Sequence, residues 1–345
     1  MQMQDTTLLS GLTSAMWYLI TIVCICLVAL QLLIIRSCIS VVRLTRWHDS
    51  MKLKGQLPNT WIPFMRPDSV SLPPLWKMIA RAVIIAPWRL IVIVFSVVLT
   101  TTMASFLKPK AALKVASVFG EIIWRAAGVC SVRFIGAPAP PREAPLVVVN
   151  HISWIDFMIM GATTQFAFVM SESVSNAPVV GKGFVQLARH VDSIVLDRGS
   201  EQSRLAAKSR IAEKLRSMMS SHSSHLERLL IFPEGTLTNG SCVVPFKLGA
   251  FEPLAPVQPL RLEYSNPHYS ICDLGTVEGI AFMLCLDGTD VTCTWGSVVS
   301  PEPHDTPQTL ADKARNALVV GSDMKLAKEG GFRDHMTLYM TPINS

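Results

Sequence analysis

The chain has 345 residues, which is enough for one large domain or two smaller ones. Half of its residues are hydrophobic and 16% are charged, well below the roughly one quarter that is typical of soluble domains, so the composition favours a membrane-associated protein. Its formal net charge of +6 is modest and accompanies no nucleic-acid-binding motif, which argues against a nucleic-acid partner.

The first element expected along the chain is a transmembrane helix at residues 16–35. These residues contain no charge and would span about 30 Å as a helix, which matches the hydrocarbon core of a bilayer. A cleaved signal peptide fits less well, because residues 1–15 contain neither Lys nor Arg and the apolar run is too long. We therefore expect a retained membrane helix that follows a short tail at residues 1–15.

A basic linker is expected at residues 36–81, where Lys and Arg far outnumber Asp and Glu. Positive charge beside a membrane helix marks its cytoplasmic side, so this linker is predicted to be cytoplasmic and the N-terminal tail lumenal or exterior. Several prolines predict an irregular connector. The connector would lie along anionic headgroups or form an ordinary solvated loop, and the sequence favours neither.

A second apolar segment covers residues 82–107, and it either spans the membrane or re-enters it. Pro87 and Arg89 interrupt its start, and the uninterrupted part is about eighteen residues long, the lower limit for a span. Three lysines follow within residues 108–114. They favour the re-entrant arrangement, in which everything after this segment is cytoplasmic.

Residues 108–345 are predicted to form one α/β domain, a sheet flanked by helices, because short apolar runs alternate there with helical patterns. The uniformly apolar strands predict a sheet that is covered on both faces. The expected strands are residues 146–149, 193–196, 229–232 and 257–264, with a later strand at 291–299. The expected helices are residues 111–129, 203–219 and 308–320.

The first candidate site follows the strand at residues 146–149 and contains Asn150, His151 and Asp156. Residues five apart point about 140° away from each other on a regular helix, so His151 and Asp156 can pair only if His151 precedes the helix and Asp156 lies in its first turn. A carboxylate bonded to one ring nitrogen fixes the tautomer and leaves the other nitrogen free to accept a proton from a hydroxyl. We therefore predict His151 as a general base. Ser153 is a poor nucleophile candidate, because no Gly-x-Ser-x-Gly elbow surrounds it.

The second candidate site follows another apolar run and consists of Phe232, Pro233, Glu234, Gly235 and Thr236. Pro233 ends the strand, and Gly235 permits a close approach of the backbone. Glu234 and Thr236 offer a carboxylate and a hydroxyl at the edge of the sheet. The alternative is that this motif is only a turn at a strand end with a solvated glutamate. That alternative explains poorly why the motif occurs together with the first one.

Weaker signals lie elsewhere in the domain. Arg198 follows a predicted strand and its planar guanidinium suits a phosphate, although an isolated Asp-Arg pair is more often a surface salt bridge. Pro256 and Pro259 by themselves indicate only a stiff strand edge. The eight cysteines lack metal-ligand spacing, and His222 and His225 lie in a Ser-rich stretch that is typical of a solvated loop. Neither a metal nor a bound cofactor is expected.

These motifs, in this order and at about these spacings, resemble the glycerolipid acyltransferase family. The resemblance covers roughly residues 75–320. The longer stretches around the motifs are most similar to the lysophosphatidylcholine acyltransferase branch. The matching positions are Asn150, His151 and Asp156 for the first family motif, Arg198 for the second, residues 232–236 for the third, and Pro256 to Pro259 for the fourth.

The resemblance implies a membrane enzyme that moves a fatty acyl group from acyl-CoA to the free hydroxyl of a lysophospholipid. His151 and Asp156 would be catalytic, Arg198 would hold phosphate, and residues 232–236 would position the glycerol portion of the acceptor. Acyl-CoA would be a co-substrate, and the lysophospholipid and the bilayer would be the partners. The resemblance also implies an endoplasmic reticulum membrane, with the catalytic domain in the cytoplasm.

Several alternatives stay open at this point. Asn150 also resembles the branches that acylate 1-acylglycerol-3-phosphate or glycerol-3-phosphate, so the acceptor is undecided. A phospholipid transacylase or hydrolase would use the same His and Asp, and an inactive membrane scaffold is a third class. Some members of the favoured branch carry calcium-binding hands towards their C-terminus. No Asp-x-Asp-x-Asp-Gly loop occurs here, so calcium control is not expected.

Overall fold

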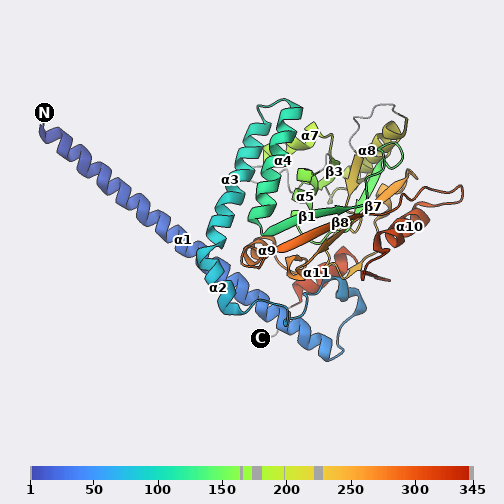
Figure 1. Cartoon of the computed structure of the whole chain (residues 1–345), viewed down its shortest axis with the longest axis horizontal. Helices are drawn as coiled ribbons and strands as arrows, with labels where there is room; N and C mark the ends of the chain where they lie inside the picture. Colours follow the sequence, from blue (N-terminus) through green and yellow to red (C-terminus); the bar gives the residue numbers. More distant parts are fainter. Residues whose placement is uncertain (1, 164–165, 173–180, 198, 221–227, 342–345) are drawn as a thin grey trace.

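The computed structural model describes residues 2–163, 166–172, 181–197, 199–220 and 228–341. A helical N-terminal part precedes an α/β domain, and the first helix projects far from the rest of the molecule (Figure 1). The elements of the N-terminal part are α1 (Gln2–Leu53), η1 (Asn59–Phe64), α2 (Leu75–Ile84) and α3 (Ala86–Ala104).

Helix α1 consists of a projecting apolar part and a part that packs against the domain. Trp17, Tyr18 and Ile25 are each more than 60% exposed, whereas Cys38 and His48 are completely buried. The helix continues to Leu53, so the prediction of an irregular connector is wrong for residues 36–53. Neither Pro nor Gly interrupts these residues, and the helix ends just before Gly55, which adopts a left-handed φ of 63°.

The basic linker is also more closely bound to the domain than expected. Arg66 is completely buried, and its guanidinium donates to the carbonyl of Ser270 at 2.7 Å. Lys77 and Arg81 both form ion pairs with Asp287. Three of the linker's cations are therefore engaged by protein groups and are not directed at lipid headgroups.

The domain is built on a seven-stranded mixed sheet of order β1-β8-β7-β2-β5-β3-β4. β7, β2, β5, β3 and β4 run parallel, while β8 is antiparallel to β7 and β1 is parallel to β8. Two further short strands, β6 (Cys242–Val243) and β9 (Lys325–Leu326), pair with each other. The strands of the large sheet are β1 (Val129–Ile135), β2 (Leu146–Val149), β3 (Phe166–Ser171), β4 (Ile194–Leu196), β5 (Arg228–Ile231), β7 (Val257–Tyr264) and β8 (Thr289–Trp295).

Helices cover both faces of this sheet, which confirms the predicted fold class. Side chains of β2 alternate between two hydrophobic cores: Val147 and Val149 enter one, Leu146 and Val148 the other. The first core is closed by α4 (Pro109–Ala126), α5 (Ile155–Thr163) and α9 (Thr276–Met283), and the second by α8 (Glu201–Ser220) and α10 (Pro307–Val319). The remaining elements are α7 (Gly181–His190), η2 (Leu248–Ala250), η3 (Pro267–Tyr269) and α11 (Phe332–Met340).

The second apolar segment forms one arm of a helical hairpin. α4 runs back beside α3, and both stand against the domain (Figure 1). α1 and α3 are each long and apolar enough to cross a membrane. α3 begins after a break at Ile85 and contains Pro87 near its N-terminus, where proline is compatible with a helix.

Candidate active site

The two sequence motifs meet at one edge of the sheet. β2 and β5 are parallel neighbours, so their carboxyl ends lie side by side and the chain leaves them at Asn150 and Phe232. Asn150 is completely buried and extends the pairing of β2 with β7. Its side-chain amide donates to the carbonyl of Leu262 at 3.0 Å, and its oxygen accepts from the Leu262 N–H at 2.8 Å. Asn150 therefore fixes the point at which the chain turns towards His151.

His151 and Asp156 form the pair that their spacing predicts. His151 lies before α5 and Asp156 in its first turn, and the distance from His151 Nδ1 to Asp156 Oδ2 is 2.9 Å. The same oxygen accepts from the backbone N–H groups of Ile152 and Ser153, at 2.7 and 3.0 Å. Asp156 thus caps the start of the helix and orients the histidine at once.

The contacts of Asp156 determine which ring nitrogen of His151 carries the proton. Oδ2 already accepts two backbone N–H groups, so Nδ1 must donate to it, and in a neutral ring Nε2 is then left as a proton acceptor. Nε2 has no hydrogen-bond partner among the described residues. The ring stacks on Phe232 with centroids 4.1 Å apart, and the side chain is 23% exposed, so the free nitrogen is accessible.

Tyr264 adds a contact that the sequence did not reveal. It lies at the end of β7, and its hydroxyl donates to Asp156 Oδ1. Burial raises the pKa of Tyr264 well above its usual value, which keeps the phenol protonated as a donor. Both oxygens of Asp156 are therefore held, and the carboxylate has no freedom to turn away from His151. The sequence placed Tyr264 at the end of a predicted strand, but it did not show that this strand is the neighbour of β2.

Glu234 lies beneath the site and connects the two motifs. It is completely buried, Oε1 accepts from the His151 N–H at 2.9 Å, and Oε2 accepts from the Val244 N–H at 3.1 Å. Both oxygens are therefore bound to backbone groups, whereas the sequence predicted an acceptor available to the substrate at the edge of the sheet. Burial raises the pKa of this carboxyl to about 8, although the two backbone N–H groups act in the opposite direction.

The residues after Glu234 form a turn that is tied to neighbouring segments. Gly235 adopts a left-handed φ of 70°, and a Cβ there would contact the side chain of Lys247. The Lys247 N–H donates to the Pro233 carbonyl at 2.8 Å. Thr236 is almost completely buried, and two residues later the Thr238 N–H donates to the His151 carbonyl at 2.7 Å.

The other sequence candidates lie at varying distances from this turn. Pro259 is inside β7 in register with Val148, and Pro256 directly precedes that strand, so both help to shape the neighbour of β2. Arg198 lies outside the described residues. The histidines at 222 and 225 do so as well, and among the residues that are described no cluster of His, Cys, Asp or Glu is arranged to hold a metal ion.

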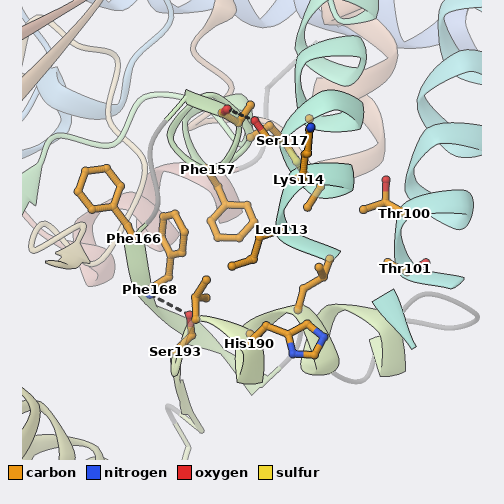
Figure 2. Close-up of a pocket in the computed structure, with 18 of the residues that line it drawn as sticks. Thr100, Thr101, Leu113, Lys114, Ser117, Phe157, Phe166, Phe168, His190 and Ser193 are labelled. Atoms are coloured by element: carbon orange, nitrogen blue, oxygen red, sulfur yellow. Dashed lines mark hydrogen bonds between the residues drawn. The ribbon is translucent and has the colours of Figure 1, made fainter. Parts of the chain in front are cut away.

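An apolar cavity of about 1010 Å³ lies on the face of the sheet covered by α4 and α5, at the upper end of the roughly 300–1,000 Å³ typical of ligand pockets. Aromatic side chains of α5 and β3 form one side, and Leu113 of α4 and Thr100 of α3 face them (Figure 2). His190 and Ser193 lie at one end. Phe157, another lining residue, directly follows Asp156 in α5, so the helix that carries Asp156 also forms part of the cavity wall.

Comparison with known proteins finds similarity to acyltransferases over part of the chain. Residues 131–262 match the family model described as Acyltransferase. The chain is 36% identical to the lysophospholipid acyltransferase LPEAT2 of Arabidopsis thaliana over 138 residues, which cover 40% of this chain and 24% of that protein. It is 30% identical to human lysophosphatidylcholine acyltransferase 1 over 203 residues, 57% of this chain and 36% of that protein.

The similarity is limited in extent. The chain spans less than half the length of the curated relatives that it matches. The crystal structure of the 1-acyl-sn-glycerophosphate (LPA) acyltransferase PlsC from Thermotoga maritima aligns with 70% of this chain and 96% of its own, with 16% sequence identity and a TM-score of 0.49.

Proposed function

We propose that the chain is a member of the acyltransferase family, whose model matches residues 131–262, and that it transfers a fatty acyl group from acyl-CoA to the free hydroxyl of a lysophospholipid. The relatives named above are lysophospholipid and lysophosphatidylcholine acyltransferases, which supports a lysophospholipid of the phosphatidylcholine type as acceptor. The observation that carries the proposal is the His151–Asp156 pair, whose free Nε2 lies at the edge of the sheet.

The proposed step is a direct transfer with His151 as general base. Nε2 takes the proton of the acceptor hydroxyl while the oxygen attacks the thioester carbonyl. The C–O bond forms, the C–S bond breaks, and the CoA thiolate takes the proton back from the imidazolium. Asp156 stabilises the positive charge on the ring and keeps its tautomer, because Nδ1 stays bonded to Oδ2 throughout.

The substrates are assigned to the groups around this pair. The cavity between α3, α4, α5 and β3 suits the acyl chain, since most of its lining is aromatic and aliphatic. The turn at residues 232–236 suits the glycerol portion, because it is tied to the main chain of His151. Arg198 is proposed as a phosphate ligand by its match to the family motif alone.

The helical arrangement supports attachment to a membrane, which we propose to be that of the endoplasmic reticulum, with the domain in the cytoplasm. The exposed apolar side chains of α1 from Met16 onwards need a non-aqueous environment. α4 accompanies α3 along its length and carries Lys110, Lys114, Glu121 and Arg125, so the hairpin cannot cross a bilayer as a unit. A dipping α3 keeps the domain on the side of the basic linker.

The test is a transfer assay on purified protein with labelled acyl-CoA and a panel of lysophospholipids, 1-acylglycerol-3-phosphate and glycerol-3-phosphate. His151→Ala should lower kcat by at least about 10²-fold, because the base is lost. His304→Ala, which removes an exposed histidine outside the site, is the matched control. Normal turnover in the His151 variant would refute the assignment. CoA release without added acceptor would indicate a hydrolase instead.

A further inference from the structure

A histidine of the last helix contacts the motif at residues 232–236. His335 lies on α11, and its Nδ1 is 2.6 Å from the hydroxyl oxygen of Thr236. Its other ring nitrogen, Nε2, bonds to the carbonyl of Cys272. The ring also stacks on Phe64 of η1, with centroids 5.3 Å apart and planes inclined by 17°. This side chain therefore connects three segments that are distant in the sequence.

The direction of these hydrogen bonds follows from their partners. A carbonyl oxygen only accepts, so Nε2 carries the hydrogen that is donated to Cys272. In a neutral ring Nδ1 is then an acceptor, and the Thr236 hydroxyl donates its only hydrogen to it. Burial lowers the pKa of His335, which favours this neutral form. The Thr236 hydroxyl thus has no hydrogen left to donate to a phosphate.

Thr236 stands between two residues that bind the main chain of His151. On one side Glu234 accepts from the His151 N–H, and on the other the Thr238 N–H donates to the His151 carbonyl. Both peptide groups of the proposed base are therefore held by this turn. His335, which lies outside the motif, holds the centre of this turn through its hydrogen bond with the Thr236 hydroxyl.

We propose that His335 is a positioning residue for the transfer reaction: by holding the Thr236 hydroxyl, it fixes the turn that holds the main chain of His151. This inference rests on the proposed function, since it assigns His335 to the same site. The C-terminal helix α11 is then a part of the active-site scaffold, although it lies about one hundred residues beyond the motif in the chain.

The experiment compares two replacements that separate hydrogen bonding from packing. His335→Phe keeps a ring for stacking on Phe64 but has no polar atom for Thr236 or Cys272. His335→Asn loses the ring but places an oxygen near the position of Nδ1, where it can accept from Thr236. If hydrogen bonding matters, kcat falls about tenfold in the Phe variant, the effect of losing one good hydrogen bond, and is largely restored in the Asn variant. A packing role alone predicts the opposite order.

A double-mutant cycle with Thr236→Val tests the route of the effect. If His335 acts through the Thr236 hydroxyl, the Phe substitution lowers kcat no further once that hydroxyl is absent. The KM for acyl-CoA should stay within about twofold in every variant, because the effect concerns the placement of the base. Additive losses in kcat would overturn the inference.

The same variants distinguish failure of this inference from failure of the proposed function. If the wild-type protein turns over acyl-CoA and the His151→Ala variant does not, the function stands, and the order of the two His335 variants decides the inference alone. Thermal unfolding of the four proteins of the cycle measures the same contact without turnover. If the effects of the two substitutions are additive both in the unfolding temperature and in kcat, His335 does not act through Thr236 and the inference is wrong.

Discussion

At the residue scale, Asp156 makes four hydrogen bonds through its side chain. It accepts from His151, from two backbone N–H groups and from Tyr264, and it is completely buried. A buried carboxylate is stable only when its charge is satisfied in this way. The hydrogen bonds also hold the carboxylate rigidly, which gives the imidazole of His151 a single orientation.

Tyr264→Phe is expected to lower kcat about tenfold, because a hydrogen bond to a charged group contributes roughly 1.5–3 kcal/mol and one oxygen of Asp156 loses its donor. The matched control is Tyr269→Phe. Its ring stacks on that of Tyr264, but its hydroxyl donates to the carbonyls of Ala127 and Asp287. Steady-state kinetics of both variants make the comparison. Equal losses in the two would show a general effect of removing a buried hydroxyl.

Glu234 predicts a pH dependence of stability. Its pKa rises from 4.5 to about 8 on folding, so between these values the folded protein holds a proton that the unfolded chain releases. The stabilisation from this proton is present at low pH and is lost as the pH rises towards 8. Asp273, whose pKa is raised to about 6, acts in the same direction but only up to that pH. Between pH 6 and 8 the loss of stability therefore comes from Glu234, whereas His48, His268 and His335, whose pKa values are lowered by burial, act in the opposite direction, so a variant of Glu234 is needed to separate the two effects.

The measurement is the unfolding temperature of the wild type and of Glu234→Gln in detergent at several pH values. The advantage of the wild type should shrink from pH 6 to pH 8, because the Gln variant cannot lose a proton. Glu252→Gln, which changes an exposed carboxylate paired with Lys208, should show no such trend. A constant difference between wild type and Glu234→Gln would mean that this carboxyl is already ionised at pH 6.

The cavity is the main feature at the scale of elements. It is formed where α3, α4, α5 and α7 stand off the sheet beside β3, and its lining is contributed by side chains from all of these elements (Figure 2). The volume of the cavity is therefore determined by the protein's own side chains. Gly161 on α5 lines it, and a Cβ added there would meet no atom within 4 Å. A larger side chain at this position has room to enter the cavity without moving the backbone.

Gly161→Leu is expected to shorten the acyl chain that the protein accepts. The kcat/KM for long-chain acyl-CoA should fall about tenfold or more while short-chain acyl-CoA is used as before, because a leucine removes volume only from the cavity. Gly161→Ala is the matched control, since it adds helix propensity but little bulk. An equal loss for all chain lengths would place the acyl chain elsewhere.

At the scale of the whole molecule, the domain is attached to a long apolar helix. α1 leaves the domain and exposes its apolar side chains from Met16 to Leu33, while its second half is anchored by buried contacts such as those of His48 (Figure 1). Residues 239–241, Asn-Gly-Ser, form a glycosylation sequon, and a glycan on Asn239 would place the domain in the lumen. The Asn239 amide donates to the carbonyls of Ile62 and Met65, so its lack of a glycan would be uninformative.

A cysteine gives a better test of orientation. Cys130 at the start of β1 is exposed, whereas Cys24 and Cys26 lie in the apolar part of α1 and the other five cysteines are buried. In sealed microsomes, a membrane-impermeant maleimide should label the wild type without detergent, and Cys130→Ser should abolish the labelling. Labelling that appears only after the membrane is permeabilised would place the domain in the lumen.

The sequence by itself determined the fold class and the identity of the two motifs. Uniformly apolar runs such as residues 146–149 predicted central strands covered on both faces, and the structure has that arrangement. The pairing of His151 with Asp156 was also predictable, because it depends on a five-residue spacing and a strand–turn–helix order. Local periodicity and local spacing are properties that a sequence carries directly.

Only the tertiary structure decided which groups complete the site. Glu234 was expected to offer an acceptor to the substrate at the edge of the sheet. It is instead buried and binds the His151 N–H, because β2 and β5 are adjacent in the sheet. Tyr264 and His335 reach the site from β7 and α11, across 108 and 99 residues of sequence. Contacts of this kind depend on strand order and helix packing, which bring distant residues together without leaving a local pattern in the chain.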